Sequence, residues 1–379
     1  MSTITTFQAV LKGIPRTTFN RCVARHQADK NCKHFYHWNH LLAMVYAQLS
    51  GVPSLRTLEA GFNSHQRYHG QLHAGPIYRS TLAKANERRT SAVFDDTAAF
   101  LMSKVSRKLR QSASSLMHLL DSTSITLKGR YFDRWTRSNR TRNTQGIKLH
   151  MLFDSSSLAP LSYEFSAANV NDVSRARQIA LQPGTLYVFD KGYCDYNWWA
   201  QIDAVGARFV TRFKSNAGLR NVKDRKIPKA AKGVVLRDEQ VQFTQQQLCK
   251  GRVNEYEKTL RRVTILRADT NEPLVLATND LKSSALNIAQ FYKRRWGIEL
   301  FFKWIKQHLK IKTFFGCSPN AVRIQIVTAL IAYLLMVLYK HEHGLTQTLW
   351  HCLNLAAATL FEPLRHPTEL AQSPQPPPL

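Results

Sequence analysis

The sequence predicts a mixed α/β protein in which a strand-rich core lies between two helical regions. Capped helical patterns cover residues 1–95, and short apolar strands bounded by turn residues begin after Ser115. Apolar helical sequence returns in residues 316–370. Within the core, three strands are followed by helix, strand, helix and strand, which is the order of a ribonuclease H-like mixed-sheet core.

Residues 1–95 are predicted to form short helices joined by tight turns. Residues 38–48 are apolar and are followed by Gly51-Val-Pro53, which should end that helix. Ser54 is placed to cap the next helix. A basic helix over residues 78–89 should be capped at Ser80 or Thr81.

This arrangement favours a DNA-binding domain of the helix-turn-helix kind, because its last helix is rich in cations. The alternative is an ordinary helical bundle with a solvated basic face. The cations on the last helix are the candidate DNA contacts: Arg79, Lys84, Arg88 and Arg89.

We assign the catalytic domain to residues 112–315. Apolar or alternating runs predict its strands at residues 116–121, 146–153, 161–165, 185–190, 207–213 and 274–278. Helices are expected at residues 173–181 and 196–204, where Trp198 and Trp199 should pack in the core. A polar, basic and β-rich insertion is predicted over residues 215–275. A run of cations here favours a DNA track over a merely solvated face: Lys214, Arg220, Lys223, Arg225, Lys226, Lys229 and Lys232. The proline-rich tail, residues 371–379, is expected to be disordered.

The charge balance points to a polyanionic partner. Lys and Arg number 53 against 25 Asp and Glu, a formal net charge of +28. Double-stranded DNA is the expected partner because phosphate neutralisation rewards many separate cations. A membrane is not expected, since the cations run along the whole chain and residues 324–339 should form a buried core helix.

The cysteine pattern and the start of the chain predict a cytoplasmic protein. Six scattered cysteines fit a reducing compartment, and no secretory signal is visible. We therefore expect a cytoplasmic protein, which a DNA partner would associate with the nucleoid. The nearby residues Cys22, His26, Cys32 and His34, with His37 and His40, fit no standard zinc spacing, so histidines on a helix face are favoured over a zinc site.

One predicted helix carries a Y-x2-R-x3-E-x6-K pattern, with its four residues within a stripe about 60° wide on an ideal helix. They are Tyr292, Arg295, Glu299 and Lys306. A carboxylate between two cations and a phenol suits a metal ion beside phosphate oxygens. The alternative is a solvated face with an Arg295–Glu299 pair.

Two aspartates are predicted to join Glu299. Asp121 and Asp190 each follow an apolar run and should end adjacent strands, where ligand groups converge. Three carboxylates suit Mg²⁺, with Mn²⁺ as a substitute, better than zinc. In a chain of this charge, the three residues predict metal-dependent chemistry on a phosphodiester.

These motifs resemble the DDE transposases of bacterial insertion sequences, in the group with the Y-x2-R-x3-E-x6-K signature (the insertion-sequence-four family). The signature is complete, and Asp190-Lys-Gly-Tyr193 is similar to the family's second-aspartate motif. Asp121-Ser-Thr resembles the first-aspartate motif, and Thr278-Asn-Asp280 the usual sequence before the helix. Residues 7–95 resemble the helical domain that precedes the core in many members.

The resemblance implies metal ligation by Asp121, Asp190 and Glu299, and contacts of Tyr292, Arg295 and Lys306 with DNA phosphates. It also implies cleavage and strand transfer at the ends of an insertion sequence, with a homodimer in the DNA-bound complex. Members often cut through a hairpin with an aromatic residue stacked on a flipped base, but the insertion here contains no tryptophan. Residues 168–172 lack the His-Asp pair found in relatives, and the sequence assigns them no role.

Two other functions remain open at this point. A stand-alone metal-dependent nuclease would use the same core, but it would not need an N-terminal domain that reads DNA ends. A catalytically silent DNA-binding protein derived from a transposase would have no need for all three carboxylates.

Overall fold

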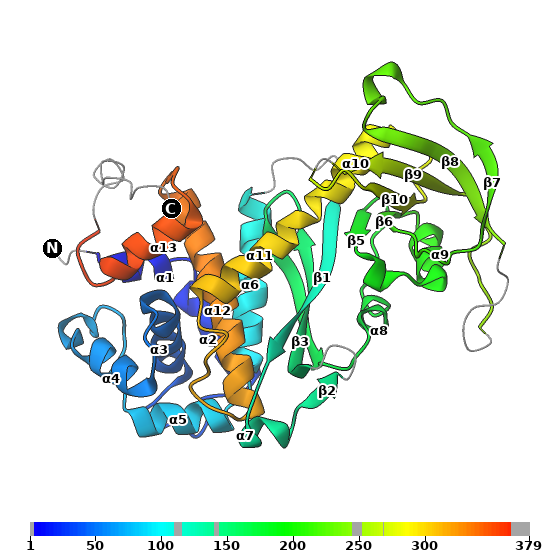
Figure 1. Cartoon of the computed structure of the whole chain (residues 1–379). Helices are drawn as coiled ribbons and strands as arrows, with labels where there is room; N and C mark the ends of the chain where they lie inside the picture. Colours follow the sequence, from blue (N-terminus) through cyan, green and yellow to red (C-terminus); the bar gives the residue numbers. More distant parts are fainter. Residues whose placement is uncertain (1–3, 110–115, 140–143, 245–251, 268, 365–379) are drawn as a thin grey trace. The chain divides into compact units, whose positions relative to one another are not determined.

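The computed structural model describes residues 4–109, 116–139, 144–244, 252–267 and 269–364. The chain divides into two compact units. Unit 1 consists of Met1–Lys108, Ile125–Thr136 and Phe302–Leu379, and unit 2 of Leu109–Ser124 and Arg137–Phe301. The mixed α/β class predicted from the sequence is confirmed, with helices in both units and a large mixed sheet in unit 2 (Figure 1).

Unit 1 is helical. Its helices are α1 (Thr6–Leu11), α2 (Arg16–Arg25), α3 (His37–Ser50), α4 (Leu55–Asn63), η1 (Gln66–Tyr68), α5 (Arg79–Arg88), α6 (Ala92–Leu109), α7 (Arg130–Asp133), α12 (Pro319–Glu342) and α13 (Leu349–Ala358). The predicted cap at Ser54 is confirmed, because its side chain accepts from the Thr57 backbone N–H. The caps predicted for α5 were wrong: Tyr78 occupies the N-cap position and makes no side-chain cap bond.

Helix α12 forms the centre of unit 1 and packs against α1, α3, α5 and α13. By length and composition it could cross a membrane, but 89% of its most apolar window is buried within the protein. The prediction of a buried core helix is therefore confirmed. Its one buried amide, Gln325, is satisfied by the loop before α12: it accepts from Phe315 N at 2.9 Å and donates to Lys310 O at 2.7 Å.

Unit 2 is built on one ten-stranded sheet. Its strands are β1 (Met117–Thr126), β2 (Arg137–Asn139), β3 (Thr144–Asp154), β4 (Ala159–Ala167), β5 (Leu186–Phe189), β6 (Arg208–Arg212), β7 (Leu219–Asp224), β8 (Val235–Phe243), β9 (Leu260–Leu266) and β10 (Pro273–Thr278). The order is β2-β3-β1-β5-β6-β10-β9-β8-β7, with β4 also paired to β3. Strand β5 runs parallel to both β1 and β6, whereas β10 is antiparallel to β6.

The strands of the predicted insertion extend this sheet. β10 pairs with β6, and β9, β8 and β7 follow outward as an antiparallel meander, with β7 at the edge (Figure 1). The helices of unit 2 are α8 (Asp172–Ala176), η2 (Lys191–Tyr193), α9 (Tyr196–Ala204) and α10 (Ala285–Arg294), with η3 (Lys229–Ala231) between β7 and β8. Trp198 and Trp199 of α9 are fully buried in an aromatic core with Phe209, as predicted.

Candidate active site

Asp121 lies within β1, because that strand continues to Thr126. The prediction that Asp121 ends its strand was therefore wrong; alternating burial through Thr123 and Ile125 keeps the chain extended. The parallel pairing of β1 with β5 nevertheless stops at Leu120. Asp121 is thus the first residue of β1 beyond the pairing with β5. Its Oδ1 accepts a hydrogen bond from the Ser122 backbone N–H at 2.8 Å.

Asp190 is the residue after β5, as predicted, and it begins the short helix η2. Because β1 and β5 are adjacent and parallel, with Leu120 opposite Phe189, Asp121 and Asp190 follow the last paired residues at the same edge of the sheet. The register of these two strands therefore places the two carboxylates side by side.

The signature segment is not one continuous helix. α10 ends at Arg294 and α11 runs from Trp296 to His308, with Arg295 at the junction. Arg295 N donates to Tyr292 O and Ile298 N to Arg295 O, both three residues back, so the turn is tighter than an α-helix. The single stripe expected from 100° per residue was therefore wrong. Glu299 lies in the first turn of α11.

The first turn of α11 packs on β1. A Cβ on Gly297 would lie 3.7 Å from Leu119 Cδ1, so the helix backbone comes close to the side chain of Leu119, two residues before Asp121. The rings of Phe301 and Phe153 pack with centroids 5.2 Å apart. This packing is what brings Glu299, between Gly297 and Phe301, toward the aspartates of the sheet.

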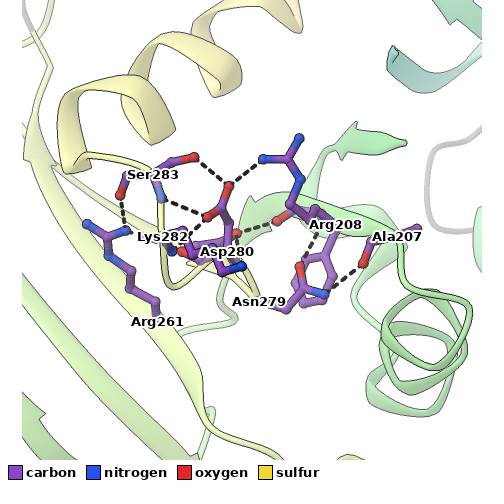
Figure 2. Close-up of polar contacts among 9 residues, drawn as sticks. Ala207, Arg208, Arg261, Asn279, Asp280, Lys282 and Ser283 are labelled. Carbon is purple, nitrogen blue, oxygen red and sulfur yellow. Dashed lines mark hydrogen bonds and ion pairs between the residues drawn. The ribbon is translucent and has the colours of Figure 1, made fainter. Parts of the chain in front are cut away.

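The start of α10 is held by a polar cluster around Asp280, shown in Figure 2. Asp280 accepts from Arg208 at 2.8 Å, from the Ser283 hydroxyl at 2.6 Å, and from the backbone N–H groups of Lys282 and Ser283. Burial would raise the pKa of Asp280, but these hydrogen bonds outweigh it and hold the pKa below its ordinary value. The carboxylate therefore stays charged and fixes the turn that leads into α10.

Asn279 ties the same turn to the central sheet. Its side-chain amide donates to Ala207 O and its carbonyl accepts from Phe209 N, both at 2.9 Å (Figure 2). Ser284 then caps α10 by accepting from Asn287 N at 3.1 Å. The signature segment is thus fixed at its start to β6 as well as at Gly297 to β1.

The three carboxylates form one electrostatic cluster. The pKa of Asp121 is raised to about 6: burial is the largest cause, and the charges of Glu299 and Asp190 add to it, against the hydrogen bond from Ser122 and the charge of Arg295. Repulsion of this kind requires that the groups lie close to one another. The structure therefore places the three residues that the sequence selected within electrostatic range of one another, on β1, after β5 and on α11. Among the described residues, the ligand atoms that all lie within 4.8 Å of one another are those of Asp29, Cys32 and His37, so the three carboxylates are spaced more widely than that.

Arg295 and Tyr292 belong to this cluster. Arg295 donates to Glu299 at 2.5 Å, and its guanidinium lies over the Tyr292 ring, 5.3 Å from the centroid. The Tyr292 hydroxyl is buried, and its proton finds no acceptor among the described residues. Arg295 Nε is likewise buried without an acceptor in the described chain. Both groups are donors of the kind that phosphate oxygens accept.

The remaining predicted contacts lie elsewhere in the chain. Lys306 lies in the last turn of α11 and belongs to unit 1. Arg79, Lys84 and Arg88 are exposed on α5. Arg89, however, donates to Phe35 O and to Cys32 Sγ, and its guanidinium packs on the Phe35 ring. A phosphate contact from Arg89 would require these interactions to break.

An open groove of about 1290 Å³ leads away from Asp190 over β6, β8, β9 and β10. Sequence reasoning did not find this groove, because its lining comes from separate strands. Its basic residues are Lys191, Arg212, Lys214, Arg237 and Arg262. Of these only Lys214 belonged to the predicted DNA track. Arg212 also lowers the pKa of Tyr292, against the larger effect of burial, which places it beside the signature segment.

The histidine and cysteine cluster of unit 1 is explained largely by hydrogen bonds. Asp29, Cys32 and His37 do lie together. Yet Asp29 Oδ1 accepts both the backbone N–H and the ring Nδ1 of His37, which ties the loop after α2 to the start of α3. His26 pairs with Asp96, and His40 with Asn86 in the interior. The described cysteines are all free.

At the edge of a mixed sheet, carboxylates lie near hydrogen-bond donors that can bind phosphate oxygens. This combination of fold and site is typical of an enzyme that acts on phosphodiesters. Residues 117–335 match the family described as "Transposase DDE domain", and residues 2–75 match a domain of unknown function. The chain therefore belongs to the DDE transposase family, which confirms the resemblance drawn from the motifs.

Individual proteins similar to this chain are also described as transposases. A putative transposase of Sinorhizobium fredii is 41% identical over 284 residues, covering 74% of this chain and 77% of that protein. A probable transposase for insertion sequence element IS5377 of Geobacillus stearothermophilus is 28% identical, covering 69% of each. The structure of a piggyBac transposase synaptic complex with hairpin DNA has a TM-score of 0.50 at 10% identity, covering 98% of this chain and 82% of that one. The fold of this chain is therefore also similar to that of a transposase.

The function predicted from the motifs is accordingly confirmed at the level of the family: the chain is a transposase, an enzyme of DNA transposition. DNA is its substrate, and the family generally uses divalent metal ions.

Proposed function

We propose that this transposase cleaves and joins insertion-sequence ends at a ribonuclease H-like centre made by Asp121, Asp190 and Glu299. The observation that carries the proposal is the convergence of the three carboxylates from β1, the end of β5 and α11, with Asp121 raised to a pKa of about 6 by burial and by the two other charges. Several negative charges in a partly buried site favour the binding of a cation.

The donor set fits Mg²⁺, or Mn²⁺ in its place. All three candidate ligands are carboxylates, which are hard oxygen donors, and the cluster contains no thiol or imidazole ligand among the described residues. When bound, such an ion supplies activation of an oxygen nucleophile and stabilisation of the leaving oxygen. The chain's own residues have to hold that ion and orient the phosphodiester.

Arg295, Tyr292 and the groove would orient the phosphodiester. Arg295 Nε and the Tyr292 hydroxyl are unused donors in the described chain, next to Glu299 and Asp190. A phosphate accepting from both would sit beside the carboxylates. The cations of the groove that begins at Asp190 would hold the flanking DNA by its backbone, and Lys306 and α5 are proposed as further phosphate contacts. We propose a homodimer as the active complex on two ends.

Alanine at Asp121, Asp190 or Glu299 should abolish cleavage while DNA-end binding stays largely intact. Each substitution removes a metal ligand, whereas most of the phosphate contacts that set affinity lie elsewhere. The measurement is Mg²⁺-dependent nicking of a duplex carrying the inverted repeats that flank the gene, with binding followed by gel shift. Glu257→Ala, at an exposed glutamate of the same unit, is the matched control and should cut normally. Near-normal cutting by Glu299→Ala would overturn the assignment.

A further inference from the structure

A second polar cluster, largely buried, is linked to Asp121 through Ser122. Its centre is Asp172, the first residue of α8, in the segment to which the sequence assigned no role. Asp172 Oδ1 accepts from Lys148 Nζ on β3 at 3.0 Å and from the Ser122 hydroxyl on β1 at 2.7 Å. His150 Nδ1 of β3 lies 3.6 Å from the same oxygen.

Lys148 determines the charge of this cluster. Its side chain is only 4% exposed and also donates to Val170 O at 2.8 Å. A lysine so deeply buried is costly unless a carboxylate compensates it. The pair with Lys148 therefore neutralises Asp172 and sets it apart from the three carboxylates of the active site. Asp172 acts on that site as a hydrogen-bond acceptor.

Two connections run from Asp172 toward the active site. Ser122 donates its hydroxyl to Asp172 and its backbone N–H to Asp121 Oδ1, so one residue joins the two carboxylates. On the other side, α8 packs on η2, and a Cβ on Gly192 would lie 3.9 Å from Asp172 Oδ2. Gly192 lies two residues after Asp190. The same carboxylate thus hydrogen-bonds the residue after Asp121 and belongs to a helix that packs on the turn after Asp190.

We propose that Asp172, charge-balanced by Lys148, is a positioning residue that holds Asp121 through Ser122, and the turn after Asp190 through the packing of α8 on η2, in the arrangement that binds the divalent cation. This inference rests on the proposed metal-binding role of the three carboxylates. Groups behind metal ligands commonly affect metal affinity tenfold to a hundredfold. The competing explanation is a purely structural ion pair, which would contribute to stability alone.

The experiment measures Mn²⁺ binding directly, through the loss of the free-ion electron paramagnetic resonance signal, alongside thermal unfolding of the full chain. Asp172→Asn and Ser122→Ala should each weaken Mn²⁺ binding, Asp172→Asn by about tenfold or more. The double variant should weaken it no more than Asp172→Asn alone, because Asp172 acts on Asp121 through Ser122. Cleavage by Ser122→Ala should recover at high Mn²⁺ concentration.

Ser122→Ala keeps the Lys148–Asp172 pair, so it remains informative if Asp172→Asn fails to fold. Ser157→Ala is the matched control, because it removes another buried Ser–Asp hydrogen bond of unit 2, from Ser157 to Asp154 at 2.9 Å. Its Mn²⁺ affinity should equal that of the unsubstituted protein. Unchanged Mn²⁺ affinity in Ser122→Ala, while Glu299→Ala loses binding, would overturn the positioning role alone. Unchanged affinity in Glu299→Ala would instead overturn the metal site itself.

Discussion

At the scale of single residues, the candidate ligands could be selected from the sequence, but the groups that support them could not. Asp190 and Glu299 stand in short local patterns of unmistakable spacing. Asp172 and Lys148 stand 24 residues apart and meet only because β3 and α8 fold together. In the sequence, Asp172 follows Asn171 like any residue at the start of a helix, so its burial against a lysine leaves no local signal.

Asp280 gives a prediction at this scale. Its depressed pKa means that it stabilises the fold above the ordinary value of 3.8, and that this contribution is lost as pH falls through the lower native pKa. Asp280→Asn should therefore lower the free energy of unfolding at pH 7 by about 1.5–3 kcal/mol, and the difference from the unsubstituted protein should shrink below about pH 3.8. Urea unfolding across about pH 3–7, a range that includes the ordinary pKa of 3.8, measures this.

The control for Asp280 is Asp269→Asn. Asp269 also pairs with an arginine, Arg267, but its side chain is 62% exposed, so its loss should change stability little. A deficit of Asp280→Asn that is equal at every pH would contradict the electrostatic account.

At the scale of elements, most strands and helices were predictable. Turn residues lie at their ends, and the burial of their side chains follows the local spacing of apolar residues. Helix α9 begins at Tyr196 and ends at Ala204, as its sequence predicts. The junction between α10 and α11 was not predictable. No proline marks it, and the helical period of apolar residues runs through it. Its position coincides with the place where Gly297 meets Leu119, a contact between segments far apart in sequence.

The junction gives a second prediction. Arg295 is buried between Tyr292 and Glu299 and can grip a phosphate with a planar fork, which lysine lacks. Arg295→Lys should lower single-turnover cleavage of pre-bound ends by roughly tenfold to a hundredfold, the loss of one charge-assisted contact in the transition state. Lys306→Arg keeps the charge and should lose less. Equal, small losses in both variants would favour charge balance on a helix face over phosphate recognition.

At the scale of the whole molecule, the +28 charge predicted DNA as partner, but the sequence did not reveal how unit 1 is assembled. Residues 1–95 read as a self-contained helical domain, whereas the structure packs α1, α3 and α5 on α12, over 200 residues further along. Local patterns report which face of a helix is apolar, but they cannot say which distant helix covers it.

A fragment of residues 1–95 should accordingly lack a stable fold. Removing α12 would expose the buried face of α3, including Leu41, Met44 and Val45. We expect no cooperative thermal transition by circular dichroism and strong binding of a hydrophobic dye. The full chain is the control and should unfold cooperatively and bind end DNA with a steep salt dependence. Cooperative unfolding of the fragment would show that α12 is dispensable.

The late position of α12 in the sequence also matters during synthesis of the chain. A ribosome that has finished residue 95 has made the first five α-helices, but α12 ends at Glu342. At elongation rates of about 5–20 residues per second, roughly ten to fifty seconds pass before α12 has been made and can cover those helices. A stop codon or frameshift anywhere before α12 would leave the early helices uncovered and open to proteolysis. Decayed copies of the gene should therefore yield no stable partial products that compete with the intact enzyme for its DNA.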